Sequence, residues 1–447
     1  MIKFEIPNKF RISNEKLNIC ISYLLYFIIG GSLTFGRPFV GLYVFGIRLG
    51  ELIVLIGFAC SLLLALFYFD GFSELFNNKK VFTILVSSFF IIMIITDSNF
   101  LEPYAYRTSS YIWFLSYIYI GYVFLSTNKM SNLVVSVIVA VPPFMYYIST
   151  GNYPDPFMEF FEIFADKFQF LKGSELTIGF IASTFFIKNL NFTTKFKFTY
   201  LTIIGAMYIP LLLFVSRGAF IAGVMFILLE TISYRYFIRK NFLYTFIILV
   251  IASGVLLLSS YRVEGSLSFE EISQAESVTT TIENIAAQKK TKNLFLGFYV
   301  NGDGYLDSWD PTTSWRLDIW QDLYYDMAKN QILLSGHGYK EIFPIMLDPT
   351  APGRLGRDGL NENVHNFIFN ILGRGGIFQV FIYLLFQIFL FSAYRKRHDN
   401  LGIINLILPL FFMSLFDATI ESVNFPLILF TFYGYFLKNG CNVSIDK

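Results

Sequence analysis

Long apolar runs separated by short polar segments dominate the chain. Runs of the length that a membrane-spanning helix requires, about 20 mostly apolar residues, recur along most of the sequence. The pattern predicts an all-α fold, a polytopic transmembrane helix bundle of about 12 spans. The expected spans are 18–35, 50–69, 81–96, 111–125, 133–149, 175–190, 198–215, 218–233, 242–259, 365–392, 401–416 and 421–437.

Composition supports this class of protein and excludes others. Hydrophobic residues make up 55% of the chain and charged residues 15%, whereas soluble domains carry about 25% charged residues. The net charge of +2 gives no reason to expect a nucleic-acid partner. Cys20, Cys60 and Cys441 lie far apart, so we predict no disulfide framework, no metal site and no cofactor.

The Lys and Arg residues between the apolar runs indicate the orientation. If the N-terminus is cytoplasmic, the inside segments hold 18 of the 34 basic residues and the short outside connections hold 6. Cytoplasmic loops carry the excess of positive charge, so both termini are predicted to be cytoplasmic. The chain then divides into spans 1–9 over residues 1–259, a long periplasmic loop over 260–364, and spans 10–12 with a cytoplasmic tail over 365–447.

The long loop is expected to have structure of its own, because ordered loops of this length are usually functional. Residues 265–293 are polar and are interpreted as a mobile helix. Residues 312–335 carry apolar side chains at helical spacing and predict an amphipathic helix, capped by Ser314 or Thr313. Residues 301–307 are interpreted as an ordinary turn, since their glycine register does not fit an EF-hand.

Ser216-Arg217-Gly218 interrupts an apolar stretch and predicts a tight outer turn between two spans. An arginine at membrane depth costs about 2.5–3.5 kcal/mol, so Arg217 should face a polar cavity or an anion. The alternative is an interfacial arginine whose side chain extends to water. The adjacent serine and glycine favour the anion, because they let backbone N–H groups approach a phosphate.

Arg316 and Trp320 are spaced i, i+4 on the expected loop helix. A guanidinium can bind phosphate oxygens in a bidentate manner, and an indole can stack on a sugar face. The alternative is a surface Arg316 paired with Asp318 or Asp322, with the tryptophans packing the helix onto the membrane part. Spacing alone favours that alternative.

His365 precedes a span in which Asn366, Asn370 and Arg374 recur every four residues and form one polar stripe. Amides and an arginine in a span should face the bundle interior, where they indicate a cavity or pathway. The positive end of the helix dipole favours the neutral imidazole of His365, which leaves a usable base. A structural hydrogen bond is the equally weighted alternative for this histidine.

Two further features are weaker. Asp417 and Glu421, at the outer turn between the last two spans, either bind sugar hydroxyls or are simply solvated. Gly373, Gly375 and Gly376 are interpreted as small residues for close helix packing, because no strand precedes them.

The order of these motifs resembles that of one family. Ser216-Arg217-Gly218-Ala219 is followed by Arg316-x-x-x-Trp320, Leu334-Ser-Gly-His-Gly-Tyr339, His365-Asn366 and Gly373-x-Gly-Gly376. This series resembles the O-antigen ligase/polymerase superfamily, integral-membrane transferases that act on undecaprenyl-diphosphate-linked glycans. The motifs cover roughly residues 200–437, and the first half of the chain is similar only in hydropathy.

The resemblance implies a GT-C-like helical fold and a metal-independent enzyme. It implies that Arg217 and Arg316 hold the lipid diphosphate and that His365 is the catalytic base or a diphosphate ligand. We also expect Trp320, Asn366, Asn370 and Arg374 to contact substrate.

The resulting hypothesis is glycosyl transfer at the periplasmic face of the bacterial inner membrane. The expected partners are an undecaprenyl-diphosphate-linked glycan, an acceptor glycan or lipid A-core, membrane lipid, and a possible chain-length regulator protein. An O-antigen or exopolysaccharide polymerase is favoured over an O-antigen ligase, which uses the lipid A-core acceptor. A transporter or flippase is a more remote alternative, since no internal repeat is visible and the polar residues gather at one face.

Overall fold

The computed structural model is mostly helical, as the apolar pattern predicts. The chain forms two compact units, described separately below. Unit 1 comprises residues 1–88, 109–260 and 382–447, and unit 2 comprises residues 89–108 and 261–381. The structure describes residues 14–66, 79–98, 110–123, 125, 137, 140–141, 143–145, 147–148, 154–165, 172–265, 297–302, 304–340, 342–348, 350–351, 354, 363–417 and 419–441.

The elements of unit 1 are helices and one short β-hairpin, with α5 and α14 ending in unit 2. They are α1 (Asn14–Phe35), α2 (Arg37–Gly41), β1 (Tyr43–Val44), β2 (Ile47–Arg48), α3 (Leu49–Leu66), α5 (Lys79–Ile95), α7 (Ser110–Val123), α9 (Asp155–Phe164), α10 (Gly173–Asn189), α11 (Thr194–Val215), α12 (Arg217–Ser233), α13 (Arg235–Lys240), α14 (Phe242–Gly265), α18 (Ile404–Ser414) and α19 (Asn424–Asn439).

The helices follow the expected spans closely. Each expected range overlaps one of these helices or α17 (Phe367–His398), apart from 133–149, which lies partly outside the described residues. Three helices are long and apolar enough to cross a membrane among the residues described: Thr194–Val215, Phe242–Val263 and Phe367–His398. The total of about 12 spans therefore stays a prediction. The polar segment 265–293 lies almost entirely outside the described residues.

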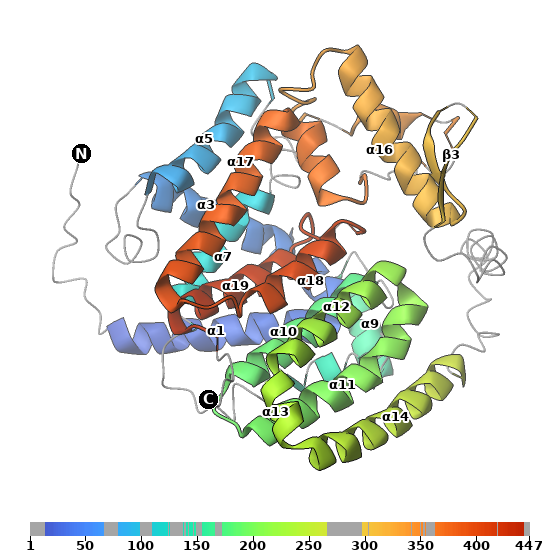
Figure 1. Ribbon diagram of the computed structural model, residues 1–447. Helices are drawn as coiled ribbons and strands as arrows, with labels where there is room; N and C mark the ends of the chain where they lie inside the picture. Colours follow the sequence, from blue (N-terminus) through green and yellow to red (C-terminus); the bar gives the residue numbers. More distant parts are fainter. Residues whose placement is uncertain are drawn as a thin grey trace. The chain divides into compact units, whose positions relative to one another are not determined.

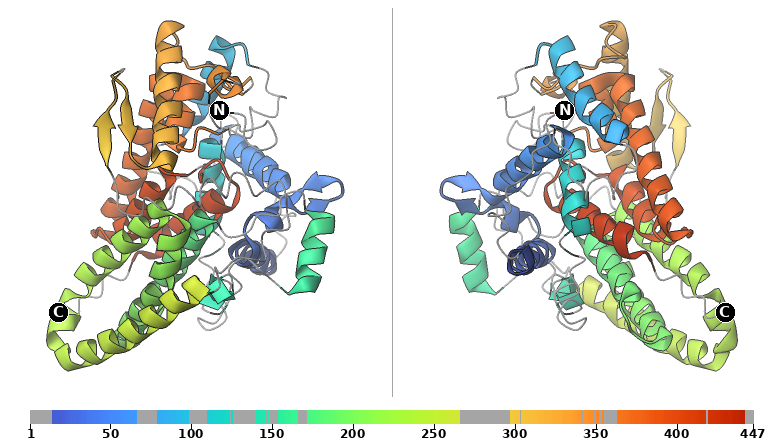
Figure 2. Two further views of the ribbon diagram at one scale, coloured as in Figure 1. Left: turned by 90° about the vertical axis from the view of Figure 1, so that its right-hand side faces the viewer. Right: turned by 90° about the vertical axis from the view of Figure 1, so that its left-hand side faces the viewer.

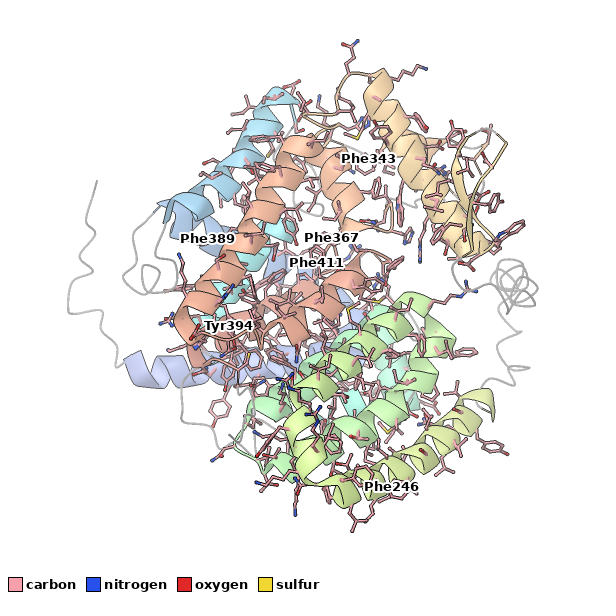
Figure 3. All side chains as sticks on the ribbon, in the orientation of Figure 1. Phe246, Phe343, Phe367, Phe389, Tyr394 and Phe411 are labelled. Carbon is pink, nitrogen blue, oxygen red and sulfur yellow. The ribbon has the colours of Figure 1, made fainter. Side chains whose placement is uncertain are left out.

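Helix α10 is the centre of unit 1. Every residue from Gly173 to Lys188 except Glu175 is buried, and the helix packs against α11, α12, α18 and α19. Figure 1 shows α10, α11 and α12 side by side. The outer surface is apolar instead: Phe246 on α14 is 57% exposed and projects away from the helix (Figure 3). An apolar exterior around a buried centre is expected of helices that face lipid.

A buried ion pair joins three of these helices. Lys188 Nζ on α10 lies 2.6 Å from Glu230 Oε2 on α12, and Asn405 Nδ2 on α18 donates to Glu230 Oε1 at 2.9 Å. Glu230 is 1% exposed. Removing one partner of such a pair leaves an uncompensated buried charge, so the network specifies how these helices pack.

Substitution of Lys188 by methionine is therefore expected to destabilise the protein by about 3 kcal/mol. The double variant Lys188→Met/Glu230→Gln should recover most of that loss, because no unpaired charge remains. Thermal unfolding of the detergent-solubilised protein measures both. A Lys188→Met variant as stable as the wild type would contradict the conclusion that this ion pair holds the three helices together.

Unit 2 is built around helix α16 (Pro311–Lys329). The hairpin of β3 (Phe298–Val300) and β4 (Leu306–Ser308) packs on it, as Figure 2 shows. Gly304 N–H donates to Asn301 O at 3.0 Å in the turn of this hairpin, so the prediction of a turn is confirmed at its start, whereas Leu306 and Asp307 belong to β4. The 3-10 helix η3 (Pro344–Leu347) and the start of α17 complete the unit. The core contains Ile319, Leu323, Met327, Phe343, Met346 and Val364.

Helix α17 is interrupted at Gly376. This glycine has φ 67° and ψ −173°, a combination that is essentially restricted to glycine. The chain bends there, so residues 367–375 and 377–398 form two arms, visible in Figure 1. The expectation of an unbroken helix from residue 365 is therefore wrong: the polar stripe of Asn366, Asn370 and Arg374 belongs to the short first arm. A membrane span within residues 367–398 stays a prediction.

Candidate functional site

His365 lies directly before the capped start of α17. The Oδ1 atom of Asn366 accepts hydrogen bonds from the backbone N–H groups of Ile368 (2.9 Å) and Phe369 (3.3 Å). His365 itself has φ +55°, an uncommon backbone state for a residue with a side chain, and such states cluster at functional sites. The position at a helix N-terminus, expected from the sequence, is confirmed, and it gives this histidine a positive local potential.

The imidazole of His365 contacts Trp315 of α16, with ring centroids 5.0 Å apart. Trp315 immediately precedes Arg316 in the first turns of α16. The loop helix thus brings its N-terminal part to the histidine, within one unit.

Helix α16 starts at Pro311 and ends at Lys329, so its end lies six residues earlier than expected. Its N-cap is Asp310, which accepts a hydrogen bond from Thr313 N–H at 3.0 Å, and the predicted caps Ser314 and Thr313 lie inside the helix.

Trp320 fixes the chain just before His365. Its indole Nε1 donates to the carbonyl oxygen of Val364 at 2.6 Å, and its ring stacks on Phe369 at 5.2 Å with an interplanar angle of 11°. Both the polar atom and a ring face are occupied within unit 2. These contacts position His365, and a contact of Trp320 with substrate stays a prediction.

The carboxylates of α16 pair with a different arginine from the one expected. Arg354 Nη2 lies 2.6 Å from Asp318 Oδ2 and 2.6 Å from Asp322 Oδ2, and the Arg354 side chain is fully buried. Burial raises the pKa of the Asp322 carboxyl and the charge of Asp318 raises it further, while Arg354 opposes both. The sequence interpretation did not include Arg354 as a partner of Asp318 and Asp322, and the pairing of Arg316 stays a prediction.

The rest of the polar stripe is buried, as predicted. Asn370 is 3% exposed and Arg374 is 1% exposed. The guanidinium carbon of Arg374 lies 4.1 Å from the ring centroid of Phe343, and Arg374 Nη1 donates to the carbonyl oxygen of Gly338 at 3.1 Å. Figure 3 labels Phe343 beside the start of α17. Arg374 thus holds the 334–339 loop, and its expected role in substrate binding stays a prediction.

Two glycine motifs meet at this loop. The backbone N–H of His337 donates to Gly373 O at 2.8 Å, and Gly338 N–H donates to Arg374 O at 2.9 Å. A Cβ on Gly376 would lie 2.2 Å from the carbonyl carbon of Leu334. The expectation that Gly373 and Gly376 allow close packing is confirmed, although Gly373 packs against the Phe343 side chain and Gly376 against the loop backbone at Leu334. His337 Nε2 also lies 2.9 Å from Asp326 Oδ2.

Arg217 belongs to unit 1. It is the first residue of α12, is exposed, and follows Ser216, whose Oγ accepts from Ala219 N–H at 3.5 Å. Helix α11 ends at Val215, so the predicted tight turn is confirmed. The start of α10 lies beside this turn: a Cβ on Gly173 would lie 2.7 Å from Ser216 Cβ.

A buried lysine lies next to the same turn. Lys172 Nζ is 3.3 Å from Asp417 Oδ1, and both side chains are mostly buried. Burial lowers the pKa of the Lys172 ammonium, the carboxylate of Asp417 raises it, and Arg37 lowers it further. Asp417 therefore pairs with a cation, a role that differs from both interpretations of the sequence.

Sequence reasoning missed three residues of these sites. Trp315 was assigned only to the apolar side of a helix, although its place directly before Arg316 could have indicated that it belongs to the site. Lys172 carried a weaker signal as a basic residue at the end of an outer connection. Arg354 carried none, because its partners Asp318 and Asp322 are more than thirty positions away in the chain.

Comparison with known proteins identifies the region that holds most of these residues. Residues 201–384 match the family model described as O-antigen ligase, a segment that includes Arg217, Arg316, His365 and Arg374. No curated protein matches the chain. The apolar helices and this match identify an integral membrane protein. Residues 201–384 are thus similar to the O-antigen ligase family, which supports the resemblance of the motif series to the O-antigen ligase/polymerase superfamily.

Proposed function

We propose that the protein is a membrane glycosyltransferase that moves an oligosaccharide or polysaccharide from an undecaprenyl-diphosphate carrier to an acceptor sugar hydroxyl. The family implies a glycosyltransferase-type enzyme that uses a lipid-linked glycan. The carrier, the location in the inner membrane, the periplasmic active face and the metal independence are part of the proposal. The positive-inside distribution of Lys and Arg supports the orientation.

The reaction needs a base, a stabilised leaving group and a positioned acceptor. The acceptor hydroxyl oxygen attacks the anomeric carbon, and the bond from that carbon to the phosphate oxygen breaks. The diphosphate leaves with an additional negative charge, which Arg217 and Arg316 neutralise. His365 takes the proton of the attacking hydroxyl.

The observation that supports this assignment most strongly is the position of His365. Its left-handed backbone, the capped helix start that follows it and the ring contact with Trp315 are local features that a purely structural histidine does not require. The helix N-terminus supplies backbone N–H groups and positive potential, both of which suit a diphosphate. Arg316 lies next to Trp315 in the same helix.

Within this function we favour a polymerase, whose acceptor is another lipid-linked repeat unit. Surface-glycan gene clusters commonly contain a polymerase, while one ligase serves a cell. The ligase is the second candidate, because the family model that matches residues 201–384 is described as O-antigen ligase. A chain-length regulator protein is a proposed partner only of the polymerase.

Complementation of null strains tests the proposal. The wild-type protein is expected to restore long glycan ladders, whereas Arg217→Ala and Arg316→Ala are expected to lose them at normal protein levels, because the leaving diphosphate is no longer neutralised. Arg239→Ala, which removes a cation from α13 at the predicted cytoplasmic side, is the control and should keep the ladder.

The material that accumulates distinguishes the two candidates. Single-repeat lipid A in the variants indicates a polymerase, and long lipid-linked polymer indicates a ligase. Normal ladders from both arginine variants would contradict the mechanism.

A further inference from the structure

A small pocket opens in unit 1 beside the Ser216–Arg217 turn. Its walls come from the end of α1, the start of α2, the start of α10 and the start of α19. The side chains used below are those of Ser32, Arg37, Lys172, Glu175 and Asn424. Its interior of about 10 Å³ admits one water-sized group, so a single hydroxyl fits and a whole sugar ring does not.

Two polar side chains in this pocket have unused hydrogen-bonding capacity. Ser32 Oγ, Asn424 Nδ2 and Asn424 Oδ1 are buried and find no hydrogen-bond partner within the described part of the chain. Both residues are 3% exposed. An unsatisfied buried polar group is costly, and in a native protein it calls for a specific explanation such as a ligand.

The chemistry of these atoms selects the ligand. Asn424 offers a free NH₂ group that donates and a free carbonyl oxygen that accepts, and Ser32 offers a hydroxyl that does both. An anion only accepts hydrogen bonds and would leave the carbonyl oxygen of Asn424 without a donor. A cation only donates and would leave the amide N–H groups of Asn424 without an acceptor. A hydroxyl both donates and accepts, carries no charge, and fits the size of the pocket.

The position of the pocket makes that hydroxyl part of a sugar. Lys172 lies at its wall and is followed by Gly173, which packs against Ser216. The pocket is therefore next to Arg217, the residue expected at the lipid diphosphate. Charged side chains of both signs at its rim suit the remaining hydroxyls of a glycan outside it.

We infer that this pocket is a glycan subsite, in which Ser32 and Asn424 hold one hydroxyl group of a substrate sugar. The inference rests on the proposed function, because that function supplies a glycan at this face. The sugar belongs either to the acceptor or to the donor, and the experiment below separates the two.

The test uses the full-length protein in nanodiscs and the repeat-unit oligosaccharide released from the host's own surface glycan by mild acid. Its binding is followed by saturation-transfer NMR for the wild type, for Ser32→Ala and for Asn424→Leu. Each variant is expected to weaken binding about tenfold, the size of one lost hydrogen bond. Ser183→Ala is the matched control: this serine is buried outside the pocket and bonded to Phe180 O, so binding should be unchanged.

Thermal unfolding supplies the second readout. Replacing an unsatisfied polar group by an apolar one should leave the unfolding temperature unchanged or raise it. Binding equal to wild type, or a loss of stability like that of a satisfied buried polar group, would overturn the inference, since a structural water would then occupy the pocket.

Kinetics assign the sugar and separate this inference from the proposed function. With the oligosaccharide as soluble acceptor and the lipid-linked repeat as donor, a raised KM for the acceptor places the acceptor sugar in the pocket, and a raised KM for the donor places the donor sugar there. Failed complementation together with intact, Ser32-dependent oligosaccharide binding would reject the transferase alone. Successful complementation with variants that bind normally would reject the pocket alone.

Discussion

Replacement of His365 by asparagine is expected to lower the rate of glycosyl transfer by about 10²–10⁴-fold, the contribution of a positioned general base. Asparagine is chosen because it tolerates the left-handed backbone that His365 adopts with φ +55°. The fold of the α17 start should therefore survive, and the loss should appear in kcat. The measurement is the initial rate of transfer by purified protein in nanodiscs.

The pH profile distinguishes a base from a diphosphate ligand. A catalytic base must be neutral, so the wild-type rate should fall as the solution becomes acidic and the imidazole takes up a proton. His337→Gln is the control, since His337 lies in the same unit but pairs with Asp326. A His365→Asn enzyme with the rate and profile of the wild type would exclude His365 from the reaction.

Replacement of Gly376 by alanine is expected to destabilise unit 2 by about 4 kcal/mol or more, at the upper end of single substitutions. Two effects combine. The backbone state of Gly376 is closed to residues with a Cβ, and the new carbon would overlap the carbonyl of Leu334 at 2.2 Å. The loop 334–339 would have to leave α17, and the hydrogen bonds to Gly373 and Arg374 would be lost.

Limited proteolysis of the 260–364 loop and thermal unfolding measure this loss. Gly254→Ala is the matched control, because Gly254 lies in the middle of α14 and a Cβ there meets nothing within 4 Å. That variant should be neutral or slightly stabilised, since alanine is the better helix former. If the Gly376→Ala and Gly254→Ala variants unfold at the same temperature and are cleaved at the same rate, the 334–339 loop does not depend on close contact with α17.

The positions of the helices were predictable because hydropathy and helical spacing act locally. The same holds for the Ser216–Arg217 turn and for the start of α17. The cap of α16 had a local signal that was misjudged: Asp310 followed by Pro311 is a typical N-cap and first helical residue. In each case a few neighbouring residues determine the structure.

The contacts between distant segments were not predictable in the same way. Arg354 and its two aspartates, or Gly336 and the backbone of Arg374, are brought together only by tertiary packing. The bend of α17 was predictable only in part. The pair Gly375-Gly376 is a local signal for a weak point in a helix, but the break itself depends on the distant 334–339 loop, whose backbone packs against Gly376. The pocket at Ser32 and Asn424 depends on four helix ends and has no local signature.

The break at Gly376 separates a polar helical arm from an apolar one, and this bears on the cost of inserting the chain into the membrane. Residues 377–398 alone, at 1.5 Å of rise per residue, reach about 33 Å and suffice for the bilayer. The first arm, with Asn366, Asn370 and Arg374, does not have to partition into lipid. We therefore expect the chain to avoid the insertion cost of about 2.5–3.5 kcal/mol for a central arginine, with His365 held at the membrane surface by a helical arm that does not cross the bilayer.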